Sequence, residues 1–265
     1  MIHEITGKDN KTLKLVRSLK RKSARRENGR FIAEGVRLVE EALKFAPKDV
    51  YCIIVSNEFA EKNAELIQVA ENVCNSIYSV KKSVFDEISD TDTPQGIMAV
   101  MNMKMTEPGF DKNTDESGCV AVLDGVSEPG NMGSIIRTAE ALGFDGIYLM
   151  KGCTDIYGPK TVRATMGSVF RVKFKTECTV DDIMNLKDKG FSIIATTPSG
   201  DTEMERFYPS GNKAVVIGNE AHGVSNEILE ISDIKMKIRM DGLAESLNAA
   251  VAAGITMHWL KVCSE

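Results

Sequence analysis

Short apolar runs and segments of helical period alternate along the whole chain. In the first hundred residues, Leu13, Val16 and Leu19 recur at helical spacing among basic residues and predict an amphipathic helix over 10–25. Further apolar runs predict a strand over 31–35 that turns into a helix over 36–45, strands at 50–56, 76–80 and 97–101, and helices at 60–72 and 83–88. This alternation is typical of a small α/β layered domain.

The alternation stops in a polar segment that contains Pro108 and is rich in Asp, Asn, Lys and Gly. Such a composition favours a linker. We therefore expect an N-terminal domain over 1–102, a linker over 103–117 and a second domain over 118–265. In the second domain, the pattern of apolar residues predicts strands at 119–123, 146–150, 191–196, 214–217 and 234–238, and helices at 131–142, 180–189 and 246–263. Its short, fully apolar strands are those of a parallel sheet covered on both faces.

The charge is unevenly distributed. The net charge is −5, but residues 1–44 hold twelve Lys and Arg against six acids, a charge of +6 that leaves −11 for the rest. A basic segment on an acidic protein indicates contact with a polyanion, although a solvated helix face would explain it too. The candidate RNA-binding residues of this segment are Lys20, Arg21, Lys22, Arg25, Arg26 and Arg30.

Other classes are disfavoured by composition. Six scattered cysteines without a CxxC pair indicate buried thiols, and three histidines without ligand spacing indicate no structural metal. The longest apolar runs are too short to span a bilayer, and the first residues lack a signal-peptide core, so we expect a cytoplasmic protein that does not enter membranes. GxGxxG, GxxxxGK[ST] and GxSxG motifs are absent.

Three polar, glycine-containing segments stand out in the second half, at 128–137, 218–223 and 245–248. Each lies at a strand end or a helix start, and in an open α/β sheet ligands bind beyond the carboxyl ends of the strands. In the first, Asn131 is a favourable helix N-cap, and Arg137 beside a helix start would suit a phosphate. In the second, Glu220 lies between glycines. His222 is a weak candidate for a catalytic residue, because a lone histidine in a loop is usually not catalytic. In the third, Ser246 is a sensible N-cap.

These three segments together resemble a known family. Glu128-Pro129-Gly130-Asn131-Met132-Gly133-Ser134-Ile135-Ile136-Arg137, then Gly218-Asn219-Glu220-Ala221-His222-Gly223, then Ile238 through Ala252 are similar in order and spacing to the three motifs of the SpoU (TrmH) RNA ribose methyltransferases of the SPOUT superfamily. More weakly, residues 1–102 are similar to that family's N-terminal substrate-binding domain, which is related to kink-turn-binding ribosomal proteins.

The resemblance implies a fold and a site. It implies an α/β domain with a parallel sheet and a deep trefoil knot, a homodimer whose active site draws on both subunits, and S-adenosylmethionine as the cofactor. The residues implied to be catalytic are Asn131, Arg137, Glu220, Ser246 and Asn248. Those implied to bind the cofactor are Thr197, Gly218, Ile238, Met240 and Leu247. Arg137 is usually given the part of activating the ribose hydroxyl, but a guanidinium is a poor proton acceptor.

The expected function is therefore S-adenosylmethionine-dependent methylation of a ribose 2′-hydroxyl, with ribosomal RNA as the expected substrate. Methylation of transfer RNA is one alternative. A non-catalytic RNA-binding protein of ribosome assembly is another, and a small-molecule enzyme that uses a nucleotide-like cofactor is a third. The sequence identifies neither the RNA nor the nucleotide.

Overall fold

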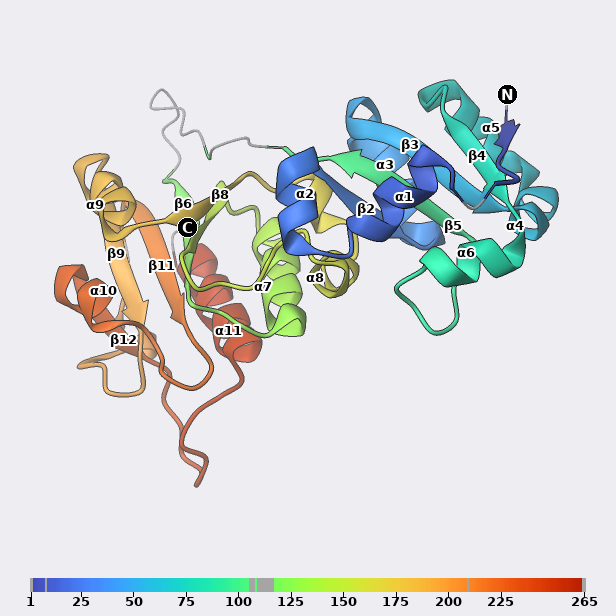
Figure 1. Ribbon diagram of the computed structural model, residues 1–265. Helices are drawn as coiled ribbons and strands as arrows, with labels where there is room; N and C mark the ends of the chain where they lie inside the picture. The colour runs from blue at the N-terminus through green and yellow to red at the C-terminus, as the bar shows by residue number, and fades with distance from the viewer. Residues whose placement is uncertain (1, 8, 105–107, 109–116, 209, 264–265) are drawn as a thin grey trace. The chain divides into compact units, whose positions relative to one another are not determined.

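The computed structural model describes residues 2–7, 9–104, 108, 117–208 and 210–263, and divides the chain into two compact units (Figure 1). Unit 1 consists of Met1–Lys104 together with Asp155–Arg171, and unit 2 of Met105–Thr154 with Val172–Glu265. The division expected from sequence put all of 118–265 in one domain, so it missed that Asp155–Arg171 belongs to the first unit. Most of the expected linker lies outside the described residues.

Unit 1 is built on a mixed sheet of five described strands in the order β1-β4-β3-β5-β2. The strands are β1 (Ile2–Glu4), β2 (Arg30–Glu34), β3 (Val50–Ser56), β4 (Ile77–Val80) and β5 (Ile97–Asn102). β5 is antiparallel to both β2 and β3, and β4 is parallel to β3 and β1. Four of these five strands were expected from their apolar runs, and β1 was not.

Helices cover both faces of this sheet. Unit 1 contains α1 (Lys11–Ser18), α2 (Lys22–Asn28), α3 (Val36–Phe45), α4 (Asn57–Lys62), α5 (Ala64–Val73), α6 (Lys82–Ile88) and α8 (Pro159–Ala164), with 3-10 turns η1 (Pro47–Asp49) and η2 (Ser168–Phe170). Leu13, Val16 and Phe85 of α1 and α6 pack on one face of the sheet. α3 and α5 lie on the other (Figure 1).

Each of the two longest helices expected in unit 1 is divided in two. The helix expected over 60–72 is interrupted between α4 and α5, and the one expected over 10–25 ends at Ser18 and restarts at Lys22. The second break has a clear cause. The Arg25 guanidinium donates hydrogen bonds to the carbonyl oxygens of Leu19 (2.8 Å) and Lys20 (2.9 Å), which supplies partners to the backbone at the break.

The segment from Asp155 to Arg171 is held to the rest of unit 1 by aromatic and charged contacts. The ring centres of Tyr157 and Phe31 lie 4.6 Å apart, and those of Phe170 and Phe31 lie 6.3 Å apart. Asp155 forms an ion pair with the buried Arg25, and Arg171 forms one with Glu41. These contacts explain why the segment is part of this unit although its neighbours in sequence belong to the other.

Unit 2 is built on a fully parallel sheet of seven described strands in the order β10-β12-β9-β11-β6-β7-β8. The strands are β6 (Cys119–Asp124), β7 (Gly146–Met150), β8 (Phe174–Cys178), β9 (Phe191–Thr196), β10 (Thr202–Glu203), β11 (Asn212–Gly218) and β12 (Ile234–Lys237). The central β6 is buried along its whole length. This confirms the α/β fold with a parallel sheet.

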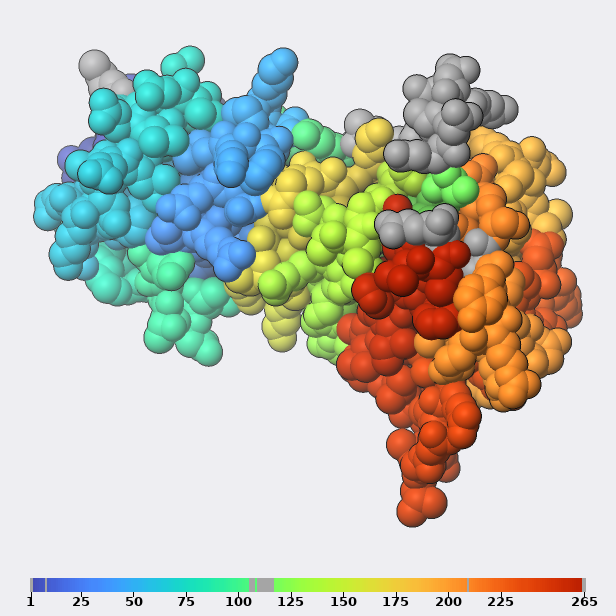
Figure 2. Space-filling model, turned by 180° about the vertical axis from the view of Figure 1, so that it is seen from behind, coloured from blue at the N-terminus to red at the C-terminus, as the bar shows by residue number. Residues whose placement is uncertain are grey.

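The helices of unit 2 cover the two faces of its sheet. They are α7 (Pro129–Ala141), α9 (Val180–Asp188), α10 (Asn226–Ile231) and α11 (Ala249–Val262), with the 3-10 turn η3 (Met204–Arg206). Ile183 of α9 and Ile228 of α10 join a core with alternate strand residues such as Val122. α7 and α11 pack side by side on the other face (Figure 1). From behind, α11, in red, forms part of the outer surface of unit 2 (Figure 2).

Two capping expectations are wrong. The N-cap of α7 is Glu128, whose Oε2 accepts a hydrogen bond from the Asn131 peptide N–H at 2.6 Å, so Asn131 lies inside the helix. The N-cap of α11 is Asn248, which leaves Ser246 outside the helix in an irregular, exposed stretch. Pro129 at the first helical position was the sequence signal that α7 begins earlier than expected. No helix among the described residues is long and apolar enough to cross a membrane.

Candidate active site

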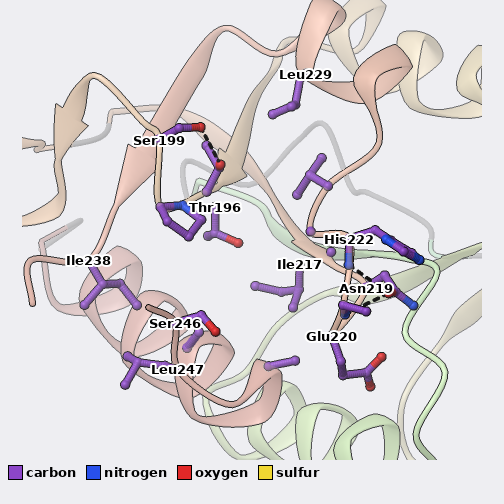
Figure 3. Close-up of a pocket in the computed structure, with 18 of the residues that line it drawn as sticks. Thr196, Ser199, Ile217, Asn219, Glu220, His222, Leu229, Ile238, Ser246 and Leu247 are labelled. Atoms are coloured by element: carbon purple, nitrogen blue, oxygen red, sulfur yellow. Dashed lines mark hydrogen bonds between the residues drawn. The ribbon is translucent and has the colours of Figure 1, made fainter. Parts of the chain in front are cut away.

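The three polar segments meet at one edge of the unit 2 sheet. Because all strands are parallel, β6, β9, β11 and β12 end at the same edge, and Gly218 at the end of β11 pairs in register with Asp124 at the end of β6. The first segment begins α7 and the third leads into α11. A cavity of about 430 Å³ opens there, within the size range of small-molecule sites (Figure 3).

The second segment is a tight loop that only glycine allows at its start. A Cβ on Gly218 would lie 2.1 Å from the carbonyl carbon of Gly223, a distance that real Cβ atoms do not adopt. The loop closes through two hydrogen bonds of 2.9 Å between the peptides of Asn219 and Gly223, and Gly223 has a φ of +71°. Backbone atoms therefore form this wall of the cavity, as expected where a chain approaches a ligand closely.

The Asn219 side chain ties this loop to the first segment. Its Nδ2 donates to the Gly125 carbonyl oxygen at 2.7 Å, and its Oδ1 accepts from the peptide N–H groups of Ala221 (2.9 Å) and His222 (3.1 Å). His222 lies at the rim of the cavity (Figure 3). Sequence reasoning did not single out Asn219, although an Asn followed by two peptide donors is a recognised turn former.

Glu220 joins the second segment to the first. Its Oε2 accepts hydrogen bonds from the Ser127 peptide N–H (3.1 Å) and from Ser127 Oγ (2.9 Å). Its Oε1 accepts from the Glu128 peptide N–H (3.1 Å) and from Asn131 Nδ2 (2.9 Å). Burial raises the pKa of this carboxyl group, but the hydrogen bonds together outweigh burial and lower the pKa to about 2. Glu220 is therefore an ionised acceptor that fixes the loop and is too weak a base to remove a proton near neutral pH.

Asn131 joins the first segment to the third. While its Nδ2 donates to Glu220, its Oδ1 accepts from Asn248 Nδ2 at 2.9 Å. Asn248 in turn caps α11, because its Oδ1 accepts from the peptide N–H groups of Ala250 (2.9 Å) and Val251 (3.3 Å). One chain of hydrogen bonds thus runs from the β11 loop through α7 to the start of α11. Three of the five expected catalytic residues belong to it.

The residues expected to bind the cofactor all line the cavity. These are Thr197, Gly218, Ile238, Met240 and Leu247, and Ser246 and Glu220 line it as well. Met236 and Ile217 add apolar surface, and the Thr197 peptide N–H is held by the Met236 carbonyl oxygen at 2.9 Å. Apolar side chains beside main-chain polar groups, with a glycine where a Cβ would collide, fit a nucleoside linked to an amino acid.

Arg137 is the one expected catalytic residue that neither lines the cavity nor belongs to this chain of hydrogen bonds. It lies on the exposed side of α7, six residues after Asn131, and is not among the residues that line the cavity. The expected RNA-binding residues belong to unit 1, where Lys20, Arg21, Lys22 and Arg26 are exposed. Lys20 Nζ donates to the Ser89 carbonyl oxygen at 2.7 Å.

Arg25 was wrongly expected to bind RNA. Only 4% of it is exposed, and its guanidinium is used by Asp155 and by the carbonyl oxygens at the α1–α2 break. Arg30 is half-buried, with its guanidinium carbon 3.4 Å from the centre of the Tyr51 ring. Among the described residues, no group of three or more His, Cys, Asp or Glu side chains is arranged to hold a metal ion.

Comparison with known proteins gives consistent matches. Residues 118–258 match the SpoU rRNA Methylase family, and residues 10–99 match the MRM3-like substrate binding domain. The chain is 31% identical, over 97% of its length and 99% of the relative's, to the 23S rRNA (guanosine(2553)-2'-O)-methyltransferase RlmP of Bacillus subtilis. Among solved structures it is similar to an AdoMet-bound rRNA methyltransferase from Sinorhizobium meliloti, with 29% identity, a TM-score of 0.85 and 98% of both chains covered. The SpoU methyltransferase AviRb from Streptomyces viridochromogenes with the cofactor AdoMet matches with 26% identity and a TM-score of 0.81, covering 96% of this chain and 98% of that one.

Proposed function

The chain belongs to the SpoU rRNA methylase family and is an S-adenosylmethionine-dependent RNA ribose 2′-O-methyltransferase, and we propose that its substrate is 23S ribosomal RNA. The observation that carries the proposal is the full-length agreement with the Bacillus subtilis enzyme, which includes the substrate-binding unit as well as the catalytic one. The guanosine in that enzyme's name is the first nucleotide to test. A ribosomal RNA substrate would place the protein in the cytoplasm.

The site's own groups suggest how the reaction is assisted. S-adenosylmethionine supplies a methyl group activated by its sulfonium, and the ribose oxygen must lose its proton as the new C–O bond forms. Neither Glu220, with its pKa of about 2, nor a guanidinium can accept that proton near neutral pH. We propose that Asn131 and Asn248 hold the ribose and the loop in place, that Ser246 contacts the methionine part, and that the proton passes to solvent water as the C–O bond forms. Arg137 would stabilise the negative charge that develops on the ribose oxygen.

We further propose that the enzyme is a homodimer in which each site receives the partner's Arg137. Two observations support this. Residues 241–248 are all exposed beside the cavity, and Leu243 among them is fully exposed. A stripe along α11 also exposes large apolar side chains, with Val251 at 50% and Ile255 at 38%. Extended apolar surface of this kind marks an interaction site, and a second subunit would cover it while supplying the missing cation.

The trefoil knot implied by the family is also a proposal for this chain. It requires backbone segments distant in sequence to pass very close to one another. What supports the proposal is the similarity of this chain to SpoU methyltransferase structures over nearly their whole length.

The experiment that tests the substrate is a comparison of RNAs. Purified protein and labelled S-adenosylmethionine are incubated with unmodified transcripts of 23S ribosomal RNA, 16S ribosomal RNA and transfer RNA. We expect label in the 23S transcript alone, and primer-extension mapping should then locate the nucleotide. Label confined to transfer RNA would favour the transfer-RNA alternative, and absence of label from all three would refute the proposal.

A further inference from the structure

Unit 1 contains a cavity of its own, to which the proposed function gives no role. Its volume is about 390 Å³, within the size range of small-molecule sites, and the residues that line it all belong to unit 1. Because β5 is antiparallel to both β2 and β3, and β4 is parallel to β3, the strands β2, β3 and β4 end at the same side of the sheet. Val36 after β2, Ser56 at the end of β3 and Lys82 after β4 all line the cavity. It therefore lies beyond the carboxyl ends of parallel strands, where open α/β sheets bind ligands (Figure 1).

The loop over 89–96 forms one wall of the cavity, and a buried carboxylate at the end of β2 holds this loop. Glu34 is only 7% exposed. Its carboxylate accepts hydrogen bonds from three groups of the loop, which are the Ser89 hydroxyl, the Thr91 hydroxyl (2.7 Å) and the Asp90 peptide N–H (3.0 Å). The wall is therefore fixed by the fold itself, as is usual for ligand sites, which are largely formed before the ligand binds.

The lining combines apolar surface with polar atoms that can still bond to a ligand. Val36, Phe59 and Pro94 supply apolar surface. Gln95 Oε1 accepts from the Val36 peptide N–H at 2.8 Å, and Asn63 Nδ2 donates to the Phe59 carbonyl oxygen at 2.9 Å. These bonds hold both amides in place and leave Gln95 Nε2 and Asn63 Oδ1 without a protein partner in the part of the chain that the structure describes. A ligand in the cavity can thus use one donor and one acceptor.

The charges of the lining balance. Lys62 and Lys82 are positive, Glu58 and Asp86 are negative, and Lys82 Nζ lies 2.6 Å from Asp86 Oδ2. A phosphate in the cavity would meet two carboxylates, whereas an uncharged ring would not be repelled. Apolar walls with a donor and an acceptor suit the ring and the polar edge of a nucleobase, and proteins read unpaired RNA bases by holding them in this way.

The basic segment reaches the same loop. Lys20 Nζ donates to the Ser89 carbonyl oxygen at 2.7 Å, and the neighbouring Arg21 and Lys22 are exposed. The Cα atoms of Ser89 and Pro94 are at most about 18 Å apart, since five residues of chain extend no further. The cations expected to hold RNA phosphates thus lie close to the cavity. Sites for unpaired nucleotides combine these two parts, with cations along the backbone and a separate place for the base.

We propose that the cavity at the ends of β2, β3 and β4 receives the base of one unpaired nucleotide of the RNA substrate, while Lys20, Arg21 and Lys22 hold phosphates beside it. The inference rests on the proposed function, because that function supplies the RNA. It gives a binding role to Val36 and Gln95, which sequence reasoning did not select.

Matched RNAs separate the base from the backbone. Each is a labelled duplex with one unpaired nucleotide in one strand, and that nucleotide carries adenine, guanine, cytosine, uracil or no base. Fluorescence anisotropy measures the Kd of the native protein for each duplex. We expect at least one base to bind more tightly than the abasic duplex by about tenfold or more, or about 1.4 kcal/mol, which is within the contribution of one base held by a protein. Equal Kd values for all five duplexes would overturn the inference without any variant.

Two substitutions of the same kind locate the effect. V36F puts a ring into the cavity from the start of α3, and V69F puts the same ring on the exposed surface of α5, outside the cavity. We expect V36F to bind all five duplexes with the native Kd for the abasic one, and V69F to keep the native preference. R21Q should weaken binding of all five by the same factor, because it removes a phosphate contact and leaves the base contact. A V36F variant that keeps the preference, or a V69F variant that loses it, would overturn the inference.

Methyl transfer by the native protein distinguishes this inference from the proposed function. Native transfer to 23S RNA combined with equal Kd values for the five duplexes refutes the base site alone. A preference for an unpaired base without any methyl transfer refutes the proposed function alone. Calorimetry with S-adenosylmethionine should give the native Kd for V36F, because the cofactor cavity lies in unit 2.

Discussion

Replacing Glu220 with Gln should slow catalysis because the residues that Glu220 holds move out of position. It should not affect proton transfer, because Glu220 does not accept the proton. Glu220 accepts four hydrogen bonds, two at each carboxylate oxygen. Glutamine has the same shape, but its amide nitrogen cannot accept, so one of the two positions becomes a donor that faces two other donors. We expect Asn131 and the Ser127–Glu128 turn to move away from their native positions.

The magnitude follows from those bonds. Hydrogen bonds to a charged group contribute about 1.5–3 kcal/mol each when buried, and Glu220 is exposed, so losing two should reduce the free energy of unfolding by about 2 kcal/mol in total. Displacement of catalytic groups by about 1 Å costs on the order of 100-fold, and we expect kcat to fall by about that factor. The Kd for S-adenosylmethionine should change far less, since most of the cavity wall is formed by other residues.

Urea titration measures the free energy of unfolding, calorimetry the Kd for S-adenosylmethionine, and labelled methyl transfer kcat. E230Q on α10 of the same unit is a matched control for the loss of an exposed carboxylate. The folded-state pKa of Glu220, about 2, is below its ordinary value. Its contribution to stability is therefore complete above the unfolded pKa of about 4.3 and is lost as the pH falls from there through 2. A Glu220→Gln enzyme with native kcat and stability, or a native pH profile whose acid limb disappears in that variant, would refute the positioning role.

Three further outcomes are expected. Asp155→Asn leaves the buried Arg25 without its carboxylate partner and should lower the free energy of unfolding by about 3 kcal/mol in urea titrations, and an unchanged midpoint would contradict the described ion pair. Gly218→Ala places a Cβ against the Gly223 backbone and should weaken S-adenosylmethionine binding by about tenfold or more in calorimetry. Val251→Lys puts a charge into the proposed subunit interface and should give a monomer in light scattering, with methyl transfer lost, whereas an active dimer would exclude α11 from that interface.

Elements with strong local patterns could be predicted from the sequence. The bounds expected for α3, β3, β7 and β9 agree with the structure, because each has a clear apolar pattern, and Gly35, Gly146 and Gly190 mark the start of three of them. Residues 151–179 carried no expected element, yet α8, η2 and β8 lie there. α8 has six residues, and β8, with Phe174 and Cys178 buried at its two ends, has little apolar alternation. Contacts with residues distant in sequence determine both, and local patterns do not contain that information.

The site was predictable as a set of residues but only partly as an arrangement. All five residues expected to bind the cofactor line the cavity, and three of the expected catalytic residues are joined by hydrogen bonds, whereas their catalytic roles stay predictions. The hydrogen bond between Asn248 and Asn131 spans 117 residues and depends on how α7 and α11 pack, which no sequence spacing reveals. Arg25 shows the opposite failure, because a charged residue in a basic helix is normally solvated, and only the fold shows that Asp155 and two carbonyl oxygens surround it.

The most direct test of the central claim is the chemical identity of the methylated product. Native protein, labelled S-adenosylmethionine and unmodified 23S transcript are incubated, and the RNA is digested completely to nucleosides for mass spectrometry. If the three segments around Glu220 and Asn131 direct a ribose oxygen to the methyl group, all of the label should be found in a 2′-O-methylated nucleoside. Label on a base, or RNA that stays unlabelled while the protein binds S-adenosylmethionine, would contradict the account.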